Sequence, residues 1–583
     1  MCGIIAYTGK RQAAGILYDG LTRLEYRGYD SAGIAVVNGL RLDYVKRAGR
    51  VAAVADARAL SGTCGVGHTR WATHGGAEDR NAHPHVCGKF AVVHNGIIEN
   101  YAALKRELTD MGHSFSSDTD SETVSHLLSS FYRGDFLSAV RQTVEKLRGS
   151  FALCVLCSDF PETIVCVRQK SPLILGRAKD GMLAASDIPA LGGCREICVL
   201  SDGQIACLTP ADCKLFSFSL APLPCKFTAS DLKSCVAEKK GFAHFMRKEI
   251  SQEGAAVVRT ARAFDEAEAR RLFGCVPYAE VFSRIFLVGC GTAYHSALTG
   301  ARLLEETLRI PVAAELASEF CCRKPLLGRH ALVLAVSQSG ETADTLAAAR
   351  LAKQKGARLA VLTNAGYSSL ARLSDHCFLT EAGVEVGVAA TKTYAAQLAF
   401  FYALCAFLRG EKAAYLRRFP AIHKKLSEGE EQIRLLAAEI VRARGVYFIG
   451  RGADYASALE GSLKLREVSY LPGAGYAAGE LKHGSIALMD GEAVVVAVAT
   501  GKALKEKMRT SVCEVRSRGA KVIAVTPFDD IPADHVLALP ACPQKYYPLL
   551  TQVPLQLLAY HAALCRGLDP DRPRNLAKSV TVE

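Results

Sequence analysis

The fold of this chain is decided by Ile285-Phe286-Leu287-Val288-Gly289 and by its second copy, Val446-Tyr447-Phe448-Ile449-Gly450. Each run is followed by a helical pattern, which begins Tyr294-His295-Ser296-Ala297-Leu298 in the first copy and Tyr455-Ala456-Ser457-Ala458-Leu459 in the second. The same interval separates the two closing glycines and the two tyrosines. Apolar strands that alternate with helices are typical of parallel sheets. The repeat therefore predicts two α/β units that share one template.

The similarity between the two units continues downstream. Residues 355–363 parallel residues 518–526, with Gly356 matching Gly519 at a slightly longer interval. We place the first unit at 241–425 and the second at 426–567. A polar tail, 568–583, follows them.

The region 1–225 has a different pattern. Short β-like runs occur at 33–37, 90–93 and 151–156, and 118–131 carries a helical pattern, which together predict an α+β domain. A stretch rich in proline and charge then interrupts the pattern, so we expect a linker at 226–240.

Composition limits the class of protein. The 583 residues are 50% hydrophobic and 22% charged, as in ordinary multidomain globular proteins. The net charge of +13 is not concentrated in basic runs, and no stretch is long and apolar enough to span a membrane. The 21 cysteines lack the paired CxxC spacing of zinc sites. We expect a cytoplasmic protein with no metal, nucleic-acid or membrane partner.

The second residue offers unusual chemistry. Removal of Met1 would make Cys2 the N-terminus, with a nucleophilic thiol and a free α-amine on one residue. The amine can then act as the base for its own thiol. Many chains begin Met-Cys by chance, so the pair alone decides nothing.

A candidate phosphate site lies in the first α/β unit. The apolar run 331–336 leads into Ser337-Gln338-Ser339-Gly340-Glu341-Thr342, and a helical pattern follows. Backbone N–H groups at a helix N-terminus, together with hydroxyls, can hold a phosphate. The spacing is not that of a Walker loop, and a plain capped turn is the alternative. The second unit has Ala497-Val498-Ala499-Thr500-Gly501-Lys502 here, so we expect a single phosphate site.

The whole chain resembles the isomerising glutamine–fructose-6-phosphate aminotransferases. The resemblance rests on motifs that occur in order: Met1-Cys2-Gly3-Ile4, residues 26–33, 68–75, 94–100, 337–342 and 478–484, and the terminal 573–583. It implies an N-terminal-nucleophile hydrolase domain with an αββα sandwich at 1–225, followed by two sugar-isomerase (SIS) units with parallel sheets flanked by helices. It also implies glutamine and fructose 6-phosphate as substrates, no cofactor, and a homodimer.

The resemblance assigns roles on the glutamine side. Cys2 would attack the amide of glutamine, with Asn95 and Gly96 as the oxyanion hole; taken alone, Asn95-Gly96 suggests a type I′ hairpin turn. Arg70 and Asp120 would bind the α-carboxylate and the α-amine, although Asp118 or Asp120 alone suggests a helix N-cap. The further glutamine-binding and channel-gating residues implied are Thr73, His74, His83, Trp71, Arg27 and Tyr29.

The resemblance also assigns roles on the sugar side. Glu467 would transfer the proton between sugar carbons, Lys464 would assist it, His483 would open the ring, and Lys578 would form a Schiff base. As a bare pattern, Lys464 and Glu467 at i and i+3 suggest a surface salt bridge. The implied sugar-phosphate-binding residues are Thr292, Ser337, Gln338, Ser339, Thr342, Glu385, Val388 and Ala577. His483 would come from the partner subunit.

Departures and rival functions remain. Ala293 and Ala390 stand where the family usually has serine, so a hydroxyl contact to the sugar is expected to be lost at Ala293. Other glutamine-dependent transferases lack SIS repeats. The remaining alternative is a SIS-type phosphosugar-binding regulator with a vestigial glutaminase domain.

Overall fold

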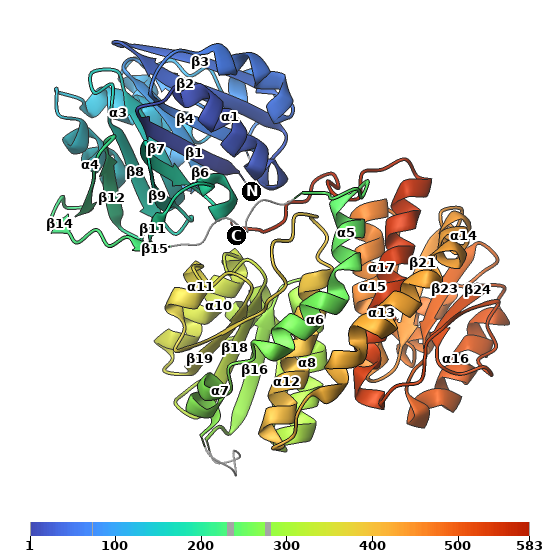
Figure 1. Ribbon diagram of the computed structural model, residues 1–583. Coiled ribbons are helices and arrows are strands. Elements are labelled where there is room, and N and C mark those ends of the chain that lie inside the picture. Colours follow the sequence, from blue (N-terminus) through green and yellow to red (C-terminus); the bar gives the residue numbers. More distant parts are fainter. Residues whose placement is uncertain (1, 73, 230–237, 275–280, 582–583) are drawn as a thin grey trace. The chain divides into compact units, whose positions relative to one another are not determined.

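The computed structural model describes residues 2–72, 74–229, 238–274 and 281–581 (Figure 1). The chain divides into two compact units. Unit 1 comprises Met1–Val236 with Ser579–Glu583, and unit 2 comprises Ala237–Lys578. Each unit is described by itself.

Unit 1 contains two antiparallel sheets. In sheet order, the eight-stranded sheet consists of β15 (Thr228–Ala229), β11 (Glu196–Val199), β9 (Ile174–Ala178), β10 (Gly181–Ala185), β1 (Gly3–Gly9), β4 (Cys64–Arg70), β2 (Ser31–Asn38) and β3 (Arg41–Ala48). The seven-stranded sheet consists of β14 (Pro222–Leu223), β13 (Cys213–Ser217), β12 (Gln204–Leu208), β8 (Ile164–Gln169), β7 (Gly149–Cys157), β6 (Phe90–Ile98) and β5 (His85–Cys87). Thr228 and Ala229, which the sequence analysis assigned to the linker, pair with β11.

Successive side chains of β1 point to opposite faces of the sheet, and they show how sheets and helices form layers in unit 1. Ile4 and Ala6 pack into a core shared by the two sheets, whereas Ile5 and Tyr7 point to the opposite face and contact α1 (Ala13–Leu24). The other sheet is covered by α2 (Tyr101–Asp110), α3 (Glu122–Phe131) and α4 (Phe136–Lys146). The predicted α+β domain with an αββα sandwich is confirmed.

Unit 2 contains two parallel five-stranded sheets with the same strand order. The first runs β17 (Val312–Leu316), β16 (Arg284–Gly289), β18 (Ala331–Ser337), β19 (Arg358–Thr363) and β20 (His376–Leu379). The second runs β22 (Gly473–Ala477), β21 (Gly445–Gly450), β23 (Ala493–Val498), β24 (Lys521–Thr526) and β25 (His535–Ala538). The predicted repeat of α/β units is thus confirmed, and β16 and β21 are its two quoted runs.

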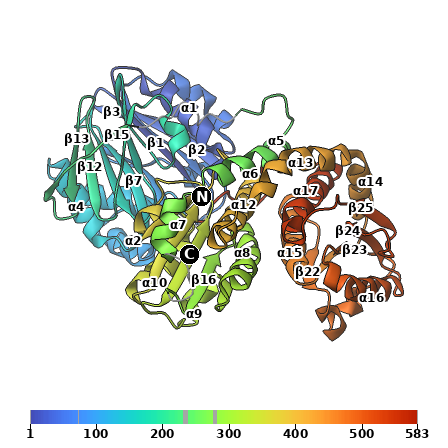
Figure 2. The ribbon, with the colours of Figure 1, turned by 60° about the horizontal axis from the view of Figure 1, so that its bottom comes forward.

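Helices surround and join the two sheets of unit 2. They are α5 (Phe245–Ser251), α6 (Glu253–Arg262), α7 (Glu266–Phe273), α8 (Thr292–Leu308), α9 (Ala317–Cys322), α10 (Ala343–Gln354), α11 (Ser369–Leu373), α12 (Lys392–Leu408), α13 (Phe419–Glu428), α14 (Glu430–Ile440), α15 (Ala453–Ser469), α16 (Lys505–Arg516) and α17 (Tyr547–Cys565). Both α12 and α17 are buried along almost their whole length. Figure 2 shows α17 beside α15, and the two helices share one core with α12.

The beginning of the polar tail is held in unit 2 by Asp571. Asp571 is buried, and its carboxylate accepts the backbone N–H groups of Phe245 at 2.7 Å and Met246 at 2.8 Å. These are orphan donors at the N-terminus of α5, so the contact caps that helix from a distant residue. The polar tail therefore packs against α5 at this point.

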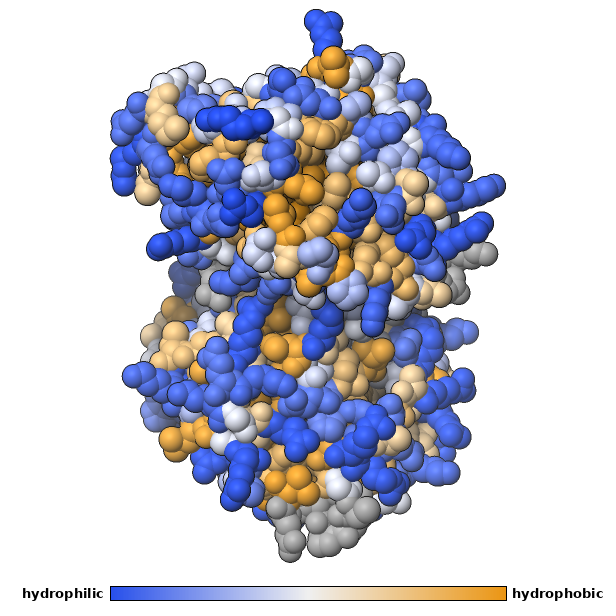
Figure 3. Space-filling model, turned by 90° about the vertical axis from the view of Figure 1, so that its left-hand side faces the viewer, coloured by the Kyte–Doolittle hydropathy of each residue, from blue (hydrophilic) through white to orange (hydrophobic). Residues whose placement is uncertain are grey.

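One face of the molecule is shown by hydropathy in Figure 3. Hydrophilic residues cover most of the face in Figure 3, with hydrophobic residues between them. Among the helices of the described ranges, none is both long and apolar enough to cross a membrane.

Candidate active sites of the two units

Cys2 lies half-buried directly before β1, and two neighbours hold it. The backbone N–H of Trp71 donates to its Sγ at 3.4 Å, and the side-chain amide of Asn95 donates to its carbonyl oxygen at 3.0 Å. Burial raises the pKa of the Cys2 thiol, and the nearby charge of Asp120 adds to this, while Arg70 opposes it. A thiol in this state needs a base to become a nucleophile.

Asn95 and Gly96 lie inside β6 and pair with Ala152 and Phe151 of β7, so the hairpin turn suggested by these two residues alone does not form. Gly96 has a φ of +126°, and a Cβ there would stand 1.9 Å from the carbonyl oxygen of Ser150. Only glycine fits at this position.

His68 fixes the orientation of the Asn95 amide. Its Nε2 lies 2.9 Å from the carbonyl oxygen of His94 and 3.1 Å from Oδ1 of Asn95. Both partners are acceptors, so Nε2 must carry the proton. The NH₂ group of Asn95 is then directed at Cys2, as a donor to a developing oxyanion needs to be.

Arg70 and Asp120 flank this nucleophile. Arg70 ends β4, and its guanidinium donates to the carbonyl oxygens of Gly75 and Gly76, each at 3.0 Å. Asp120 accepts the backbone N–H of Ile98 in β6 at 2.7 Å. It does not cap α3, whose N-cap residue is Ser121. The carboxylate is therefore tied to the strand that carries Asn95.

The remaining glutamine-side residues lie at different depths. Arg27 is buried, pairs with Asp187 at 2.5 Å, and places Nε 3.4 Å from the carbonyl oxygen of Cys2. The rings of His83 and His68 are 4.0 Å apart, and burial holds the pKa of His83 well below its usual value. The ring of His74 meets Tyr101 edge-on.

Two further residues of this group complete the glutamine side. Tyr29 is half-buried. Thr73 lies outside the described residues.

In unit 2, the predicted phosphate turn joins β18 to α10. Ser337 is the last residue of β18, and its hydroxyl lies 3.0 Å from that of Thr342, which is the N-cap residue of α10. The N–H of Gly340 donates to Oγ of Ser337, and that of Glu341 to Oγ of Ser339. These hydroxyls and N–H groups converge on one turn, which is a suitable site for an anion.

The turn also carries Gln338, whose carbonyl oxygen accepts the N–H of Asn364 at 3.1 Å. Gly340 has a φ of +64°, and a Cβ there would stand 2.0 Å from Oγ of Ser368. Glycine is therefore required for this shape.

Lys464 and Glu467 form an ion pair in which the lysine is buried and the glutamate is half-buried. The Lys464 side chain is 1% exposed, and its Nζ lies 2.6 Å from Glu467 and 3.0 Å from the hydroxyl of Thr292. The alternative of a surface salt bridge is thus excluded. Burial alone would lower the pKa of Lys464, but neighbouring carboxylates, first Glu460 and then Glu467, raise it.

Glu460 was not predicted as a site residue. Its side chain is buried, and its carboxylate accepts a hydrogen bond from the hydroxyl of Thr292 at 3.0 Å. The same carboxylate lies 2.7 Å from Nδ1 of His295 and 3.4 Å from Nζ of Lys464. The only sequence signal was its place four residues before Lys464 on α15, which puts both on one face.

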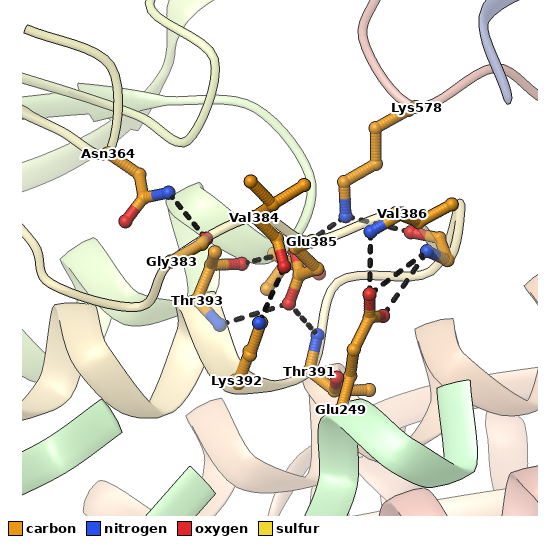
Figure 4. Close-up of polar contacts among 12 residues, drawn as sticks. Glu249, Asn364, Gly383, Val384, Glu385, Val386, Thr391, Lys392, Thr393 and Lys578 are labelled. Carbon is orange, nitrogen blue, oxygen red and sulfur yellow. Dashed lines mark hydrogen bonds and ion pairs between the residues drawn. The ribbon is translucent and has the colours of Figure 1, made fainter. Parts of the chain in front are cut away.

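Lys578 reaches a second buried carboxylate cluster, shown in Figure 4. Its Nζ pairs with Glu385 and donates to the carbonyl oxygen of Gly387 at 2.8 Å. Glu385 also accepts the N–H groups of Thr391 and Thr393. Although burial opposes it, Lys578 lowers the pKa of Glu385 to about 2.

Glu249 was also missed by the sequence analysis. It is buried beside this cluster and accepts the N–H of Val386 at 2.6 Å. Burial and the charge of Glu385 raise its pKa to about 8. Nothing in the sequence around α5 marked it, because its partners lie far along the chain, beyond β20.

Three further predicted sugar-side residues are placed as follows. Val388 is buried and donates its N–H to the carbonyl oxygen of Asp571 at 3.4 Å, and Ala577 is half-buried beside Lys578 in the chain. His483 is exposed at the end of a 3₁₀ turn, Glu480–His483. Within the described part of the chain, no hydrogen bond or ion pair joins His483 to Lys464 or Lys578.

Comparisons with known proteins agree with this division. A model of the glutamine amidotransferase domain matches residues 68–193, and a model of the SIS domain matches 282–406 and 439–566. The chain is 42% identical to the glutamine–fructose-6-phosphate aminotransferase (isomerising) of Caldanaerobacter subterraneus subsp. tengcongensis and 44% identical to that of Gloeobacter violaceus, over 100% of each chain. The chain belongs to the glutamine–fructose-6-phosphate aminotransferase family.

Solved structures resemble unit 2 in the same way. The C-terminal domain of the Francisella tularensis glucosamine-fructose-6-phosphate aminotransferase is 33% identical, with a TM-score of 0.53, and the match covers 58% of this chain and 100% of that one. The tagatose-6-phosphate ketose/aldose isomerase of Escherichia coli is 19% identical, with a TM-score of 0.52, over 58% and 97% of the two chains. The latter likeness shows the fold alone.

The two SIS units of this family member differ at the phosphate turn. After β23, the carboxylate of Asp454 accepts the N–H of Thr500 at 2.8 Å and that of Gly501 at 3.3 Å. Asp454 is buried, which raises its pKa to about 6. The chain's own carboxylate thus occupies the N–H groups of Thr500 and Gly501 in the second turn.

Proposed function

We propose that this chain converts fructose 6-phosphate and L-glutamine into glucosamine 6-phosphate and L-glutamate. The observation that carries the proposal is the presence of two chemistries in one chain. A thiol beside an oriented amide donor suits glutamine hydrolysis, and a buried lysine with carboxylates suits imine chemistry on a phosphosugar. A phosphosugar-binding regulator would not require both, so the alternative is not favoured.

The glutaminase step would begin after removal of Met1. The α-amine of Cys2 takes the thiol proton, and the thiolate attacks the amide carbon of glutamine. Asn95 and Gly96 stabilise the oxyanion, and ammonia leaves with a thioester on Cys2. Water then hydrolyses the thioester and releases glutamate. Arg70 and Asp120 bind the α-carboxylate and the α-amine.

Four other residues support this step. Thr73, His74 and His83 are the proposed further contacts of glutamine. Trp71 is the proposed gate for ammonia, which water would otherwise protonate.

The sugar step would begin with phosphate in the turn from Ser337 to Thr342. Lys578 attacks the C2 carbonyl of the open-chain sugar, water leaves, and a Schiff base forms. The ion pair with Glu385 holds Nζ of Lys578 in position, and the amine loses a proton before it attacks. Ammonia then displaces Lys578, and Glu467 moves a proton from C1 to C2.

Lys464 has a supporting role in this step. Its ammonium lies 2.6 Å from the carboxylate of Glu467 and orients it for the proton removal. Thr292, in turn, orients the ammonium of Lys464 through its hydroxyl.

We also propose a homodimer in which His483 opens the sugar ring bound to the partner subunit. Two observations support this: His483 is exposed, and among the described residues no hydrogen bond or ion pair joins it to Lys578 of its own chain. Co-expression of H483A and K578A chains tests it. Each variant alone should be inactive, whereas mixed dimers should regain activity, because one of their two sites then holds both residues. No recovery in a verified mixed dimer would contradict the shared site.

The overall proposal is tested by Cys2→Ala. This variant should lose glutamate production, while conversion of fructose 6-phosphate to glucose 6-phosphate remains detectable. Normal glutamate production by Cys2→Ala would refute the assignment of the nucleophile. Intact mass after reaction with an electrophilic glutamine analogue should show loss of Met1 together with a single label.

A further inference from the structure

Three metal-binding side chains meet in unit 1 outside the proposed active site. They are Cys87 at the end of β5, His113 in the segment after α2, and His126 in α3. One ligand atom from each lies within 4.8 Å of the other two. Sγ of Cys87 is 3.3 Å from Nδ1 of His126, and the two Nδ1 atoms are 3.0 Å apart.

The outer nitrogens of both rings face other partners. Nε2 of His113 lies 2.8 Å from the hydroxyl of Ser130, and Nε2 of His126 lies 3.6 Å from the carboxylate of Glu122. Glu122 is itself held by the N–H groups of Ser116 and Ser117. Histidine ligands of metals usually donate their second ring N–H to a carboxylate, carbonyl or water in this way, which leaves the inner nitrogen for the metal.

We propose that Cys87, His113 and His126 form a binding site for a zinc-like divalent transition metal. A thiolate with two imidazoles is a borderline-soft donor set, which favours zinc over magnesium or calcium. Within the described ranges, no fourth cysteine, histidine, aspartate or glutamate belongs to the group, so water would complete a tetrahedron. Cys87 and His113 are half-buried, which leaves a path for the ion.

The bound metal would link the three elements that carry its ligands. It would tie the end of β5 to α3 and to the segment at His113. The segment between His113 and α3 also carries Asp120, which is bonded to Ile98 in β6. A ligand that binds the folded state raises its stability, so the metal should raise the melting temperature of unit 1.

The test uses the full chain, stripped with a chelator and titrated with Co²⁺ and then Zn²⁺. We expect a thiolate-to-cobalt charge-transfer band in the near ultraviolet that saturates at one equivalent and disappears when Zn²⁺ is added. Cys87→Ser should remove the band. Cys513→Ser, which changes an exposed cysteine in unit 2, should leave it unchanged.

His113→Ala is the second variant, because it keeps the thiol and alters a half-buried side chain. We expect it to weaken Zn²⁺ binding at least tenfold. Binding in Cys87→Ser equal to that of the unaltered chain would overturn the proposal. So would failure of the unaltered chain to retain Zn²⁺ through gel filtration.

Discussion

The carboxylate of Asp454 accepts the hydroxyl of Thr500 at 2.5 Å and its N–H at 2.8 Å. Asp454 is the second residue of α15, and Ala293 holds the matching place as the second residue of α8. A methyl group cannot accept hydrogen bonds, so Ala293 cannot hold the turn after β18 as Asp454 holds the turn after β23. One residue type thus distinguishes the proposed phosphate-binding unit from its copy.

Ala293→Asp should close the first turn as Asp454 closes the second. The added carboxylate would compete with phosphate and repel it, so KM for fructose 6-phosphate should rise at least ~10-fold, since ~1.4 kcal/mol corresponds to a factor of ten. Glutamine hydrolysis without sugar should be unchanged. Ala293→Ser adds a hydroxyl without charge and is the matched control. An unchanged KM in Ala293→Asp would show that the two positions are not equivalent.

Asn95→Ala should slow glutamine hydrolysis by about 100- to 1,000-fold in kcat, because it removes one oxyanion donor. KM for glutamine should change much less. Asn100→Ala alters an asparagine shortly after the same strand, whose side chain bonds to the backbone of Lys146 and Arg148, and it should retain activity. Steady-state glutamate release measures both. A loss in Asn95→Ala seen only in KM would argue against the oxyanion role.

Lys464→Met should destabilise unit 2 by about 3–5 kcal/mol, because it leaves Glu460 buried without its cation. The exposed pair of Lys482 and Glu514 provides the control, and Lys482→Met should cost less than about 1 kcal/mol. Urea denaturation of each variant gives the comparison. If the two substitutions lowered the free energy of unfolding equally, Lys464 would not be neutralising a buried charge.

Glu249→Gln should alter the pH dependence of stability. The pKa of Glu249 in the folded chain is raised to about 8 from an ordinary 4.5, so the folded state binds this proton more tightly than the unfolded state. Its contribution to stability is therefore complete below about pH 4.5 and is lost as the pH rises through 8.

Over that range the unaltered chain should lose stability, on the order of 5 kcal/mol, that Glu249→Gln retains. Denaturation midpoints at several pH values provide the measurement. If the stability of the two proteins changed with pH in the same way, the raised pKa of Glu249 would be contradicted.

Much of the fold could be predicted because its signals are local. The runs that became β16 and β21 carry their own burial pattern and turn glycines. The pairing of Lys464 with Glu467 was equally local, since three residues on a helix fix their distance. The family resemblance supplied the roles of residues far apart in sequence.

The site residues that could not be predicted from the sequence are those whose contacts join segments far apart in the chain. Glu460 contacts His295 across α15 and α8, and Glu249 contacts a loop beyond β20. Neither carboxylate stands in a sequence motif that marks it as a site residue. The cluster at Cys87 was missed for the same reason, because its ligands come from three elements and follow no motif spacing.

The central claim is that nitrogen released at Cys2 ends on the sugar. The chain should be incubated with fructose 6-phosphate and glutamine labelled with ¹⁵N in its amide, in a buffer that contains unlabelled ammonium, and the product analysed by mass spectrometry. The product should be glucosamine 6-phosphate that carries ¹⁵N, and the Cys2→Ala variant should form no labelled product. Amino sugar without the label, or labelled product from Cys2→Ala, would contradict it.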